Sequence, residues 1–309
     1  MLHSINFVLL GDYNIIGELG KKGTTSDISI YDRKTPDIIY SWTAPITFPD
    51  KIQPLMQAVN MGEYAILNVT KMDKYLGEQI IALDSVEFSD GFILHSYDID
   101  ETKLKMLLKD TTVSNFKFVD GIDQLKQVTN TLRPKSSVGS LIIYVDHAFD
   151  VKGVGTVILG VVKQGIVRVH DELAILPTGK NILVKSIQMH DDSVQEAASP
   201  ARVGLAIKGV TAEEVSRGDV ICLPETVKIS SGPISVKFTK SSFFKGELAE
   251  NQTYMLSVGL QIKPVKINRK DDFLEIVLEK PVAYRSDQIA VLLKPDSQGT
   301  RIVGKGIIQ

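Results

Sequence analysis

The stretch Val145–Pro177, VDHAFDVKGVGTVILGVVKQGIVRVHDELAILP, decides the fold of the middle of the chain. It is rich in β-branched residues, and glycines interrupt it at short intervals. This pattern predicts short strands joined by tight turns, in which Gly153 and Gly155 supply positive φ and Gly165 forms the next hairpin. A small closed β-barrel accommodates such strands best, and we expect it to span residues 138–227.

The chain on the C-terminal side of this barrel is also rich in strand patterns. Turn signals occur at residues 231–233, 271–272 and 296–299. We therefore predict a second barrel over residues 228–309.

The chain on the N-terminal side has a different pattern. The run INFVLL, Ile5–Leu10, is apolar except for Asn6 and ends at Gly11, as expected for a buried parallel strand. Further predicted strands are 64–69 and 91–94, and predicted helices are 49–60, 77–84 and 101–109. Alternating strands and helices predict an α/β domain with a parallel sheet over residues 1–137, ending in the linker-like segment RPKSS.

Composition and charge limit the possible classes of function. The chain has 309 residues, of which 43% are hydrophobic and 23% charged, as in folded globular proteins. Residues 1–137 carry net charge −4 and the remainder +2, which argues against a non-specific DNA or RNA coating protein. The single cysteine, Cys222, excludes an intramolecular disulfide and a Cys-rich zinc site. We expect a monomeric cytoplasmic protein with no membrane span.

The barrel sequence resembles the second domain of the EF-Tu group of translational GTPases. The resemblance rests on F-x-x-x-G-x-G-T-V from Phe149, on KSIQ, and on ARVGLAIKGV followed by RGD. Within this group, the chain resembles the SelB-like branch of archaea more than EF-Tu itself. The segments that carry this resemblance are DHAF, KSIQ, ARVGLAIKGV and the tail RIVGKGII. The resemblance implies a G domain of the P-loop type followed by two β-barrels, and for its activity GTP hydrolysis with GTP and magnesium.

The phosphate-binding positions of such a G domain are altered in this chain. The family pattern G-x-x-x-x-G-K-[ST] should follow the first strand. Counted from Gly11, Ile16 and Gly17 replace the expected glycine and lysine, and a one-residue shift that uses Gly17 places Glu18 at the lysine position. A carboxylate there repels triphosphate oxygens. The rival run GKKGTT, at residues 20–25, lies too far beyond the strand to act at a loop-to-helix junction.

The other nucleotide motifs are missing as well. Residues 42–46 hold no D-x-x-G, and the first switch is too short for a magnesium-binding threonine. Of the base-recognition motif N-K-x-D after residue 94, only Asp98 remains, and the alternative TKMD at residues 70–73 follows the preceding strand. We therefore interpret Gly11, Gly17, Glu18 and Asp98 as a vestigial nucleotide site, and predict that GTP and magnesium are no longer cofactors.

The resemblance also implies an aminoacyl-binding site on the middle barrel. The matching positions here are Asp146, His147, Phe149 and Arg202. A guanidinium at position 202 could pair with an anionic or polar side chain of the esterified amino acid. In the alternative interpretation, Asp146 and Arg202 form a structural ion pair at the barrel rim. No second ligand lies at a useful spacing from the histidines, so we expect no metal site.

Three hypotheses about function remain open. The first is a SelB-like paralogue that binds tRNA or aminoacyl-tRNA, with the ribosome as a further partner and no role for DNA or membranes. The second is a divergent translational GTPase that still binds GTP. The third is a protein-docking module of the translation apparatus. Basic residues on the third domain, Lys263, Lys266, Arg269 and Lys270, either contact RNA backbone or form a solvated strand face.

Overall fold

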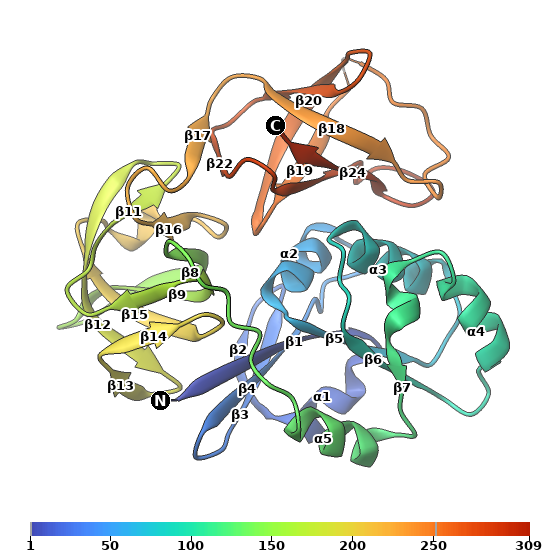
Figure 1. Cartoon of the computed structure of the whole chain (residues 1–309), viewed down its shortest axis with the longest axis horizontal. Helices are drawn as coiled ribbons and strands as arrows, with labels where there is room; N and C mark the ends of the chain where they lie inside the picture. Colours follow the sequence, from blue (N-terminus) through green and yellow to red (C-terminus); the bar gives the residue numbers. More distant parts are fainter. Residues whose placement is uncertain (1, 251) are drawn as a thin grey trace. The chain divides into compact units, whose positions relative to one another are not determined.

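The computed structural model describes residues 2–250 and 252–309. In chain order it contains a seven-stranded sheet with helices, a barrel and a second closed barrel (Figure 1). This confirms the expected α/β domain followed by two β-barrels. The chain divides into two compact units. One holds Met1–Pro134, Lys240–Gly246 and Leu293–Lys305, and the other holds Lys135–Thr239, Glu247–Leu292 and Gly306–Gln309.

The N-terminal sheet has the strand order β2-β3-β4-β1-β5-β6-β7. The predicted strands are parallel, whereas β3 runs antiparallel to both β2 and β4. The expectation of a parallel sheet is therefore wrong at this edge, because the connections 26–28 and 35–37 are too short for a crossover helix. The strands are β1 His3–Gly11, β2 Lys21–Thr25, β3 Ser29–Lys34, β4 Ile38–Ala44, β5 Tyr64–Val69, β6 Gly91–His95 and β7 Lys117–Phe118.

Strand β1 is buried on both faces because helices cover both faces of the sheet. Phe7 and Leu9 share a buried cluster with Leu19 of α1 and Leu125 of α5. Figure 1 places α2 and α3 on the opposite face. The helices are α1 Ile16–Leu19, α2 Gln53–Met61, α3 Lys74–Ser85, α4 Glu101–Leu108 and α5 Ile122–Asn130, with short 3-10 helices η1 Tyr13–Ile15, η2 Thr112–Asn115 and η3 Ala212–Glu214.

The helix boundaries depart from the sequence-based expectation at two places. The helix predicted for residues 49–60 begins at Gln53, and Pro54 rather than Pro49 lies in its first turn. Pro49 instead belongs to a turn at residues 46–50. Helix α3 begins before the predicted Gly77, because the side chain of Asp73 accepts hydrogen bonds from the backbone amides of residues 75 and 76.

The middle barrel closes through the order β11-β16-β8-β9-β15-β12 and the additional pairing of β12 with β11. Gly153, Gly155 and Gly165 have φ of 82°, 99° and 75°, which confirms their predicted turn conformations. The strands of this part are β8 Ile142–Val151, β9 Gly155–Gln164, β10 Ile166–Arg168, β11 Glu172–Leu176, β12 Lys180–Met189, β13 Asp192–Val194, β14 Glu196–Ala198, β15 Arg202–Lys208 and β16 Val220–Cys222.

The C-terminal part forms a closed barrel in the order β18-β21-β20-β19-β23-β24. The three predicted turns lie between its strands or just before them. The strands are β17 Lys228–Ser230, β18 Ile234–Lys240, β19 Tyr254–Val258, β20 Gln261–Arg269, β21 Leu274–Leu278, β22 Val282–Tyr284, β23 Ile289–Leu293 and β24 Ile302–Ile308.

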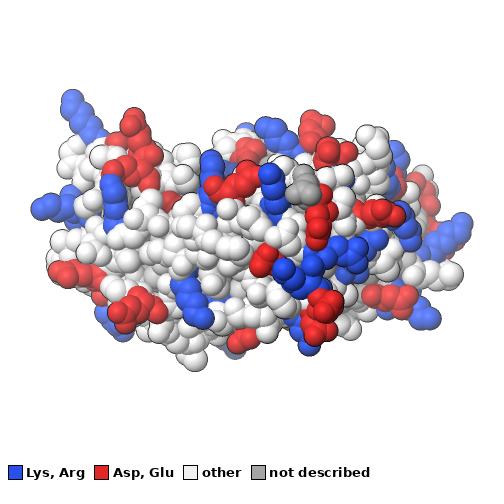
Figure 2. Space-filling view, turned by 90° about the horizontal axis from the view of Figure 1, so that it is seen from above, with Lys and Arg blue, Asp and Glu red and all other residues white. Residues whose placement is uncertain are grey.

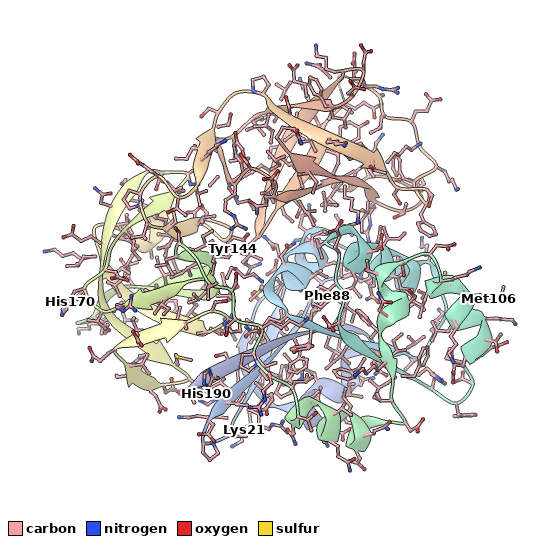
Figure 3. All side chains as sticks on the ribbon, in the orientation of Figure 1. Lys21, Phe88, Met106, Tyr144, His170 and His190 are labelled. Atoms are coloured by element: carbon pink, nitrogen blue, oxygen red, sulfur yellow. The ribbon has the colours of Figure 1, made fainter. Side chains whose placement is uncertain are left out.

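Two glycines allow close approach of backbone segments around β8 and β20. A Cβ atom on Gly218 would lie 2.8 Å from the Cα of Gln261, and one on Gly259 would lie 2.7 Å from the ring of Tyr144, labelled in Figure 3. The Tyr144 hydroxyl accepts a hydrogen bond from Nε2 of Gln288 at 3.1 Å. Larger residues at either glycine would force these segments apart.

Candidate functional site

A β-bulge on β8 places Asp146 inside the rim of the middle barrel. Val145 pairs with Gly160 of β9 and His147 pairs with Leu159, so Asp146 is the additional residue in the ladder. The bulge turns the Asp146 side chain inward, where it is 4% exposed, whereas His147 is exposed. Two neighbouring residues on one strand therefore present a carboxylate to the interior and an imidazole to solvent.

Two guanidinium groups flank the Asp146 carboxylate. Nη2 of Arg202, the first residue of β15, lies 2.7 Å from Oδ2. Nε of Arg217 donates to the Asp146 backbone carbonyl at 3.1 Å and lies 3.8 Å from Oδ1. The side chains of Arg202 and Arg217 are only 14% and 21% exposed. Both guanidinium groups therefore act on the Asp146 carboxylate at a position where water screens their charges weakly.

One atom of this group lacks a hydrogen-bond partner. Nη1 of Arg202 is buried and has none among the residues that the structure describes. A buried guanidinium donor without a partner costs free energy, and an acceptor group brought by a ligand would remove this cost. Nη1 of Arg202 is therefore the donor in this group that an anionic or polar acceptor would satisfy.

Aromatic surface lies further along β8, on residues that are exposed. Phe149 is 37% exposed, and its ring centroid lies 5.9 Å from that of the exposed His147. The structure brings Asp146 of β8 into contact with Arg202 of β15, two strands away across β9, whereas His147 and Phe149 are exposed on β8 and make no contact with Arg202 among those found for the described residues. Sequence reasoning missed Arg217, although the R-G-D segment that contains it was among the motif residues.

The predicted nucleotide-site positions are arranged differently. Gly11 ends β1 with φ of 84°, and its amide donates to Oε1 of Gln79 at 3.1 Å. Gly17 and Glu18 lie in α1, which has only four residues, and Nζ of Lys126 lies 3.5 Å from the Glu18 carboxylate. Asp98 lies in a turn after β6. Among the residues that the structure describes after β1, the first α-helix, α1, has four residues and no cation at its start, where a phosphate group would need one.

The segment GKKGTT at residues 20–25, the alternative candidate for a phosphate-binding loop, contains an exposed edge strand. Residues Lys21–Thr25 make up β2, and all five are exposed. Figure 3 labels Lys21 at this part of the sheet. In the TKMD segment, the Asp73 carboxylate caps α3 and so occupies the helix N-terminus. The residues present do not fit a magnesium-bound triphosphate at the expected place, and we derive no reaction step through one.

Residues 2–250 and 252–309 hold no group of three or more His, Cys, Asp or Glu side chains arranged to bind a metal ion. His170 and His190, labelled in Figure 3, lie well apart. Within the same ranges, no helix has the length and apolar character needed to cross a membrane.

Comparison with known proteins agrees with this architecture. Residues 155–222 match the family model of elongation factor Tu domain 2. The chain is 35% identical over 308 residues to "Uncharacterized protein MJ0325" of Methanocaldococcus jannaschii, covering 96% of this chain and 97% of that protein. It is 31% identical over 231 residues to the selenocysteine-specific elongation factor of the same organism, covering 66% of this chain and 49% of the factor.

A solved structure shows the same fold over the whole chain. Translation elongation factor SelB from Methanococcus maripaludis, in complex with the GTP analogue GppNHp, superimposes with a TM-score of 0.85 at 24% identity, covering 100% of this chain and 79% of that one. The barrel motifs, the sheet followed by two barrels, and these relatives lead to one assignment. The chain belongs to the same family as MJ0325, within the SelB-like branch of the EF-Tu group of translation factors.

Proposed function

We propose that this protein is a SelB-like paralogue that binds tRNA or aminoacyl-tRNA through its barrel domains, without GTP hydrolysis. The observation that carries the proposal is the buried Nη1 atom of Arg202, which has no partner among the described residues and lies beside the Asp146 carboxylate. From the resemblance to the EF-Tu group, we propose that the esterified amino acid binds at this rim.

The charge of the rim favours a ligand with an acceptor group. Arg202 and Arg217 both lie against Asp146. An anionic or polar amino-acid side chain would accept the hydrogen bond that Nη1 of Arg202 does not make to the described residues. The exposed faces of His147 and Phe149 offer stacking surface for a terminal nucleotide.

The remaining surface suits a selective contact rather than general binding of nucleic acid. Figure 2 shows Lys and Arg interspersed with Asp and Glu on the visible face. Lys266 and Arg269 on β20 are exposed and could contact RNA backbone. Because binding by phosphate neutralisation scales with the number of cations in contact, a mixed surface leaves discrimination to local sites such as the barrel rim.

Loss of the nucleotide cycle is the second part of the proposal. It is supported by Glu18 at the lysine position, by the four-residue α1, and by the use of Asp73 as a helix cap. These features remove the positive charge and the free helix N-terminus that bind phosphate.

The experiment compares charged and uncharged tRNA on four proteins. These are the wild type, Arg202→Ala, Arg202→Lys and the control Arg168→Ala, which removes an exposed arginine of the same barrel, paired with Glu196 at 3.1 Å. We expect Arg202→Ala to weaken the binding of charged tRNA about ten- to hundredfold, which corresponds to the loss of a charge-assisted hydrogen bond. The affinity for uncharged tRNA should stay nearly unchanged. Arg202→Lys should recover only part of the affinity, because lysine lacks the planar fork.

Equal affinity of the wild type for both tRNA forms would contradict the aminoacyl-site proposal. An equal loss for both forms in Arg202→Ala, together with a lower melting temperature, would assign Arg202 a purely structural role with Asp146. GTP or GDP carried through purification would favour a divergent GTPase, and a stoichiometric protein partner would favour a docking module.

A further inference from the structure

A pocket of about 270 Å³ lies at the carboxyl edge of the N-terminal sheet, where β1 and β5 end. Its walls come from the segment after β1, from Phe48 and Pro49, from the residues after β5 and from the first turns of α3. Gly17, Glu18 and Asp98 are not among its lining residues. The pocket is therefore distinct from most of the vestigial nucleotide positions and shares only Gly11 with them.

The apolar wall of the pocket is held in place. The rings of Phe48 and Tyr75 meet edge to face, with centroids 6.1 Å apart. The guanidinium of Arg301 stacks on Phe48 at 5.5 Å and donates from Nη1 to the Pro49 carbonyl at 2.7 Å. Arg301 is in turn paired with Glu78 of α3. This wall presents a rigid aromatic surface, which favours a bound ligand because little ordering is needed.

The polar floor of the pocket is satisfied internally. Gln79 Oε1 accepts the Gly11 amide, and the Tyr13 hydroxyl donates to the Pro45 carbonyl at 3.3 Å. Burial raises the pKa of Tyr13, so it stays a neutral phenol at physiological pH. The floor therefore contributes no charge to a ligand.

Three side chains at the pocket each have an oxygen atom that accepts no hydrogen bond from the described residues. Asp12 uses Oδ1 for the Asn14 amide at 2.9 Å, which leaves Oδ2. Asn68 uses Nδ2 for the Asp12 carbonyl at 2.9 Å, which leaves Oδ1. Asp73 uses Oδ1 to cap α3, while its Oδ2 lies 3.8 Å from Nζ of Lys71.

The side chains that line the pocket carry one more negative than positive charge. Asp12 and Asp73 contribute carboxylates, and Lys71 contributes a cation whose side chain is 78% exposed. Outside this lining, Nζ of Lys74 lies 5.0 Å from the centroid of the Tyr75 ring. The N-terminus of α3 is already capped by Asp73 and is closed to an external anion. A phosphate would be repelled, whereas a positively charged donor would find acceptors and ring faces.

We propose that this pocket binds an organic cation, a guanidinium or ammonium group carried on an apolar stem. The stem packs on Phe48 and Tyr75, and the charged head donates to Asp12, Asn68 and Asp73. The pocket thus has the opposite ligand preference from a nucleotide site. The proposal does not rest on the tRNA-binding role, because it concerns different residues.

The test uses butylguanidinium and the matched neutral probe butylurea, titrated into the full chain labelled with ¹⁵N and followed by NMR. We expect butylguanidinium to shift the amide signals of Gly11 and Gln79 with a millimolar Kd, as is usual for a ligand of this size, and butylurea to bind at least about tenfold more weakly. Asp12→Asn and Asp73→Asn should each weaken the binding of butylguanidinium at least about tenfold. Asparagine preserves both caps, so these variants should fold.

The control Asp110→Asn, in the turn after α4, should leave binding unchanged. A tripeptide Gly-Arg-Gly distinguishes the source of the cation: stronger binding than butylguanidinium points to an arginine of a partner protein, and weaker binding to a free small molecule. The proposal is overturned if pyrophosphate binds more tightly than butylguanidinium, if butylurea binds equally well, if both Asn variants bind normally, or if saturating probe shifts no pocket signal.

Discussion

The buried ion pair between Glu78 and Arg301 allows a prediction whose magnitude follows from the structure. The two side chains are 5% and 12% exposed. Every hydrogen bond found for the Glu78 carboxylate among the described residues comes from Arg301: from the backbone amide at 2.7 Å, from Nε at 3.1 Å and from Nη2. Arg301→Met keeps the amide and removes the guanidinium.

The expected loss of stability is about 3 kcal/mol. Removing one partner of a buried pair typically costs about 3 to 5 kcal/mol, because the other charge stays buried without compensation. We take the lower end since the amide of residue 301 still donates to Glu78. This corresponds to a decrease in melting temperature of roughly 6 to 12 °C for a body of this size. The double variant Glu78→Gln/Arg301→Met buries no charge and should lose only about 1 kcal/mol.

The assay combines thermal unfolding with hydrogen exchange of α3. Lys305→Met is the matched control, since Lys305 pairs with Glu87 at 3.2 Å but both side chains are more exposed, 31% and 58%. Such a pair is worth at most about 1 kcal/mol. If Arg301→Met were no more destabilised than Lys305→Met, or the double variant as unstable as Arg301→Met, the reasoning from burial would be refuted.

Three further predictions can be checked directly. With magnesium present, GTP and GDP should show no saturable micromolar binding by titration calorimetry, and Glu18→Lys alone should not restore it, because the other motifs are also missing. We propose domain boundaries at 137/138 and 227/228. A fragment of residues 138–309 should therefore melt cooperatively, because its barrels have closed cores. An aggregated fragment would show these boundaries to be wrong. Burial raises the pKa of Cys222 to about 11, so the native thiol should resist Ellman's reagent at pH 8 until urea unfolds the chain, and rapid native labelling would contradict this.

The sequence was sufficient to predict the parts of the fold that depend on local pattern. The apolar run Ile5–Leu10 is β1 because a strand covered on both faces has no polar alternation. Gly153, Gly155 and Gly165 have the positive φ that tight turns require. Such positions are readable because steric limits on the backbone act within a few residues.

Features that depend on distant contacts could not be predicted. The strands β2, β3 and β4 carry mixed polar and apolar residues, and their hairpin pairing at the sheet edge depends on β1. The amphipathic helix α5 was also missed, because its buried residues Leu125 and Thr129 are few and its N-cap is a glycine. The segment TKMD could be interpreted as a remnant of the base-recognition motif, but the side chain of Asp73 in it caps α3.

The barrel-rim site was predictable in part. The pairing of Asp146 with Arg202 was one of two open interpretations, and the structure contains that ion pair. The pair does not exclude the other interpretation, because Nη1 of Arg202 stays without a partner among the described residues. Arg217 could not be placed from sequence, since its approach to Asp146 depends on the bulge in β8.

The exposed strand β2 also affects how the protein behaves at high concentration. It lies at the end of the sheet order and so pairs on one side only among the described strands. An unpaired strand edge can template addition of another chain, but here the edge carries Lys21 and Lys22, and its register with β3 is interrupted before Thr25. Charge repulsion and the irregular edge act against self-association. Replacing both lysines by valine should therefore promote the formation of fibres or precipitate at high protein concentration.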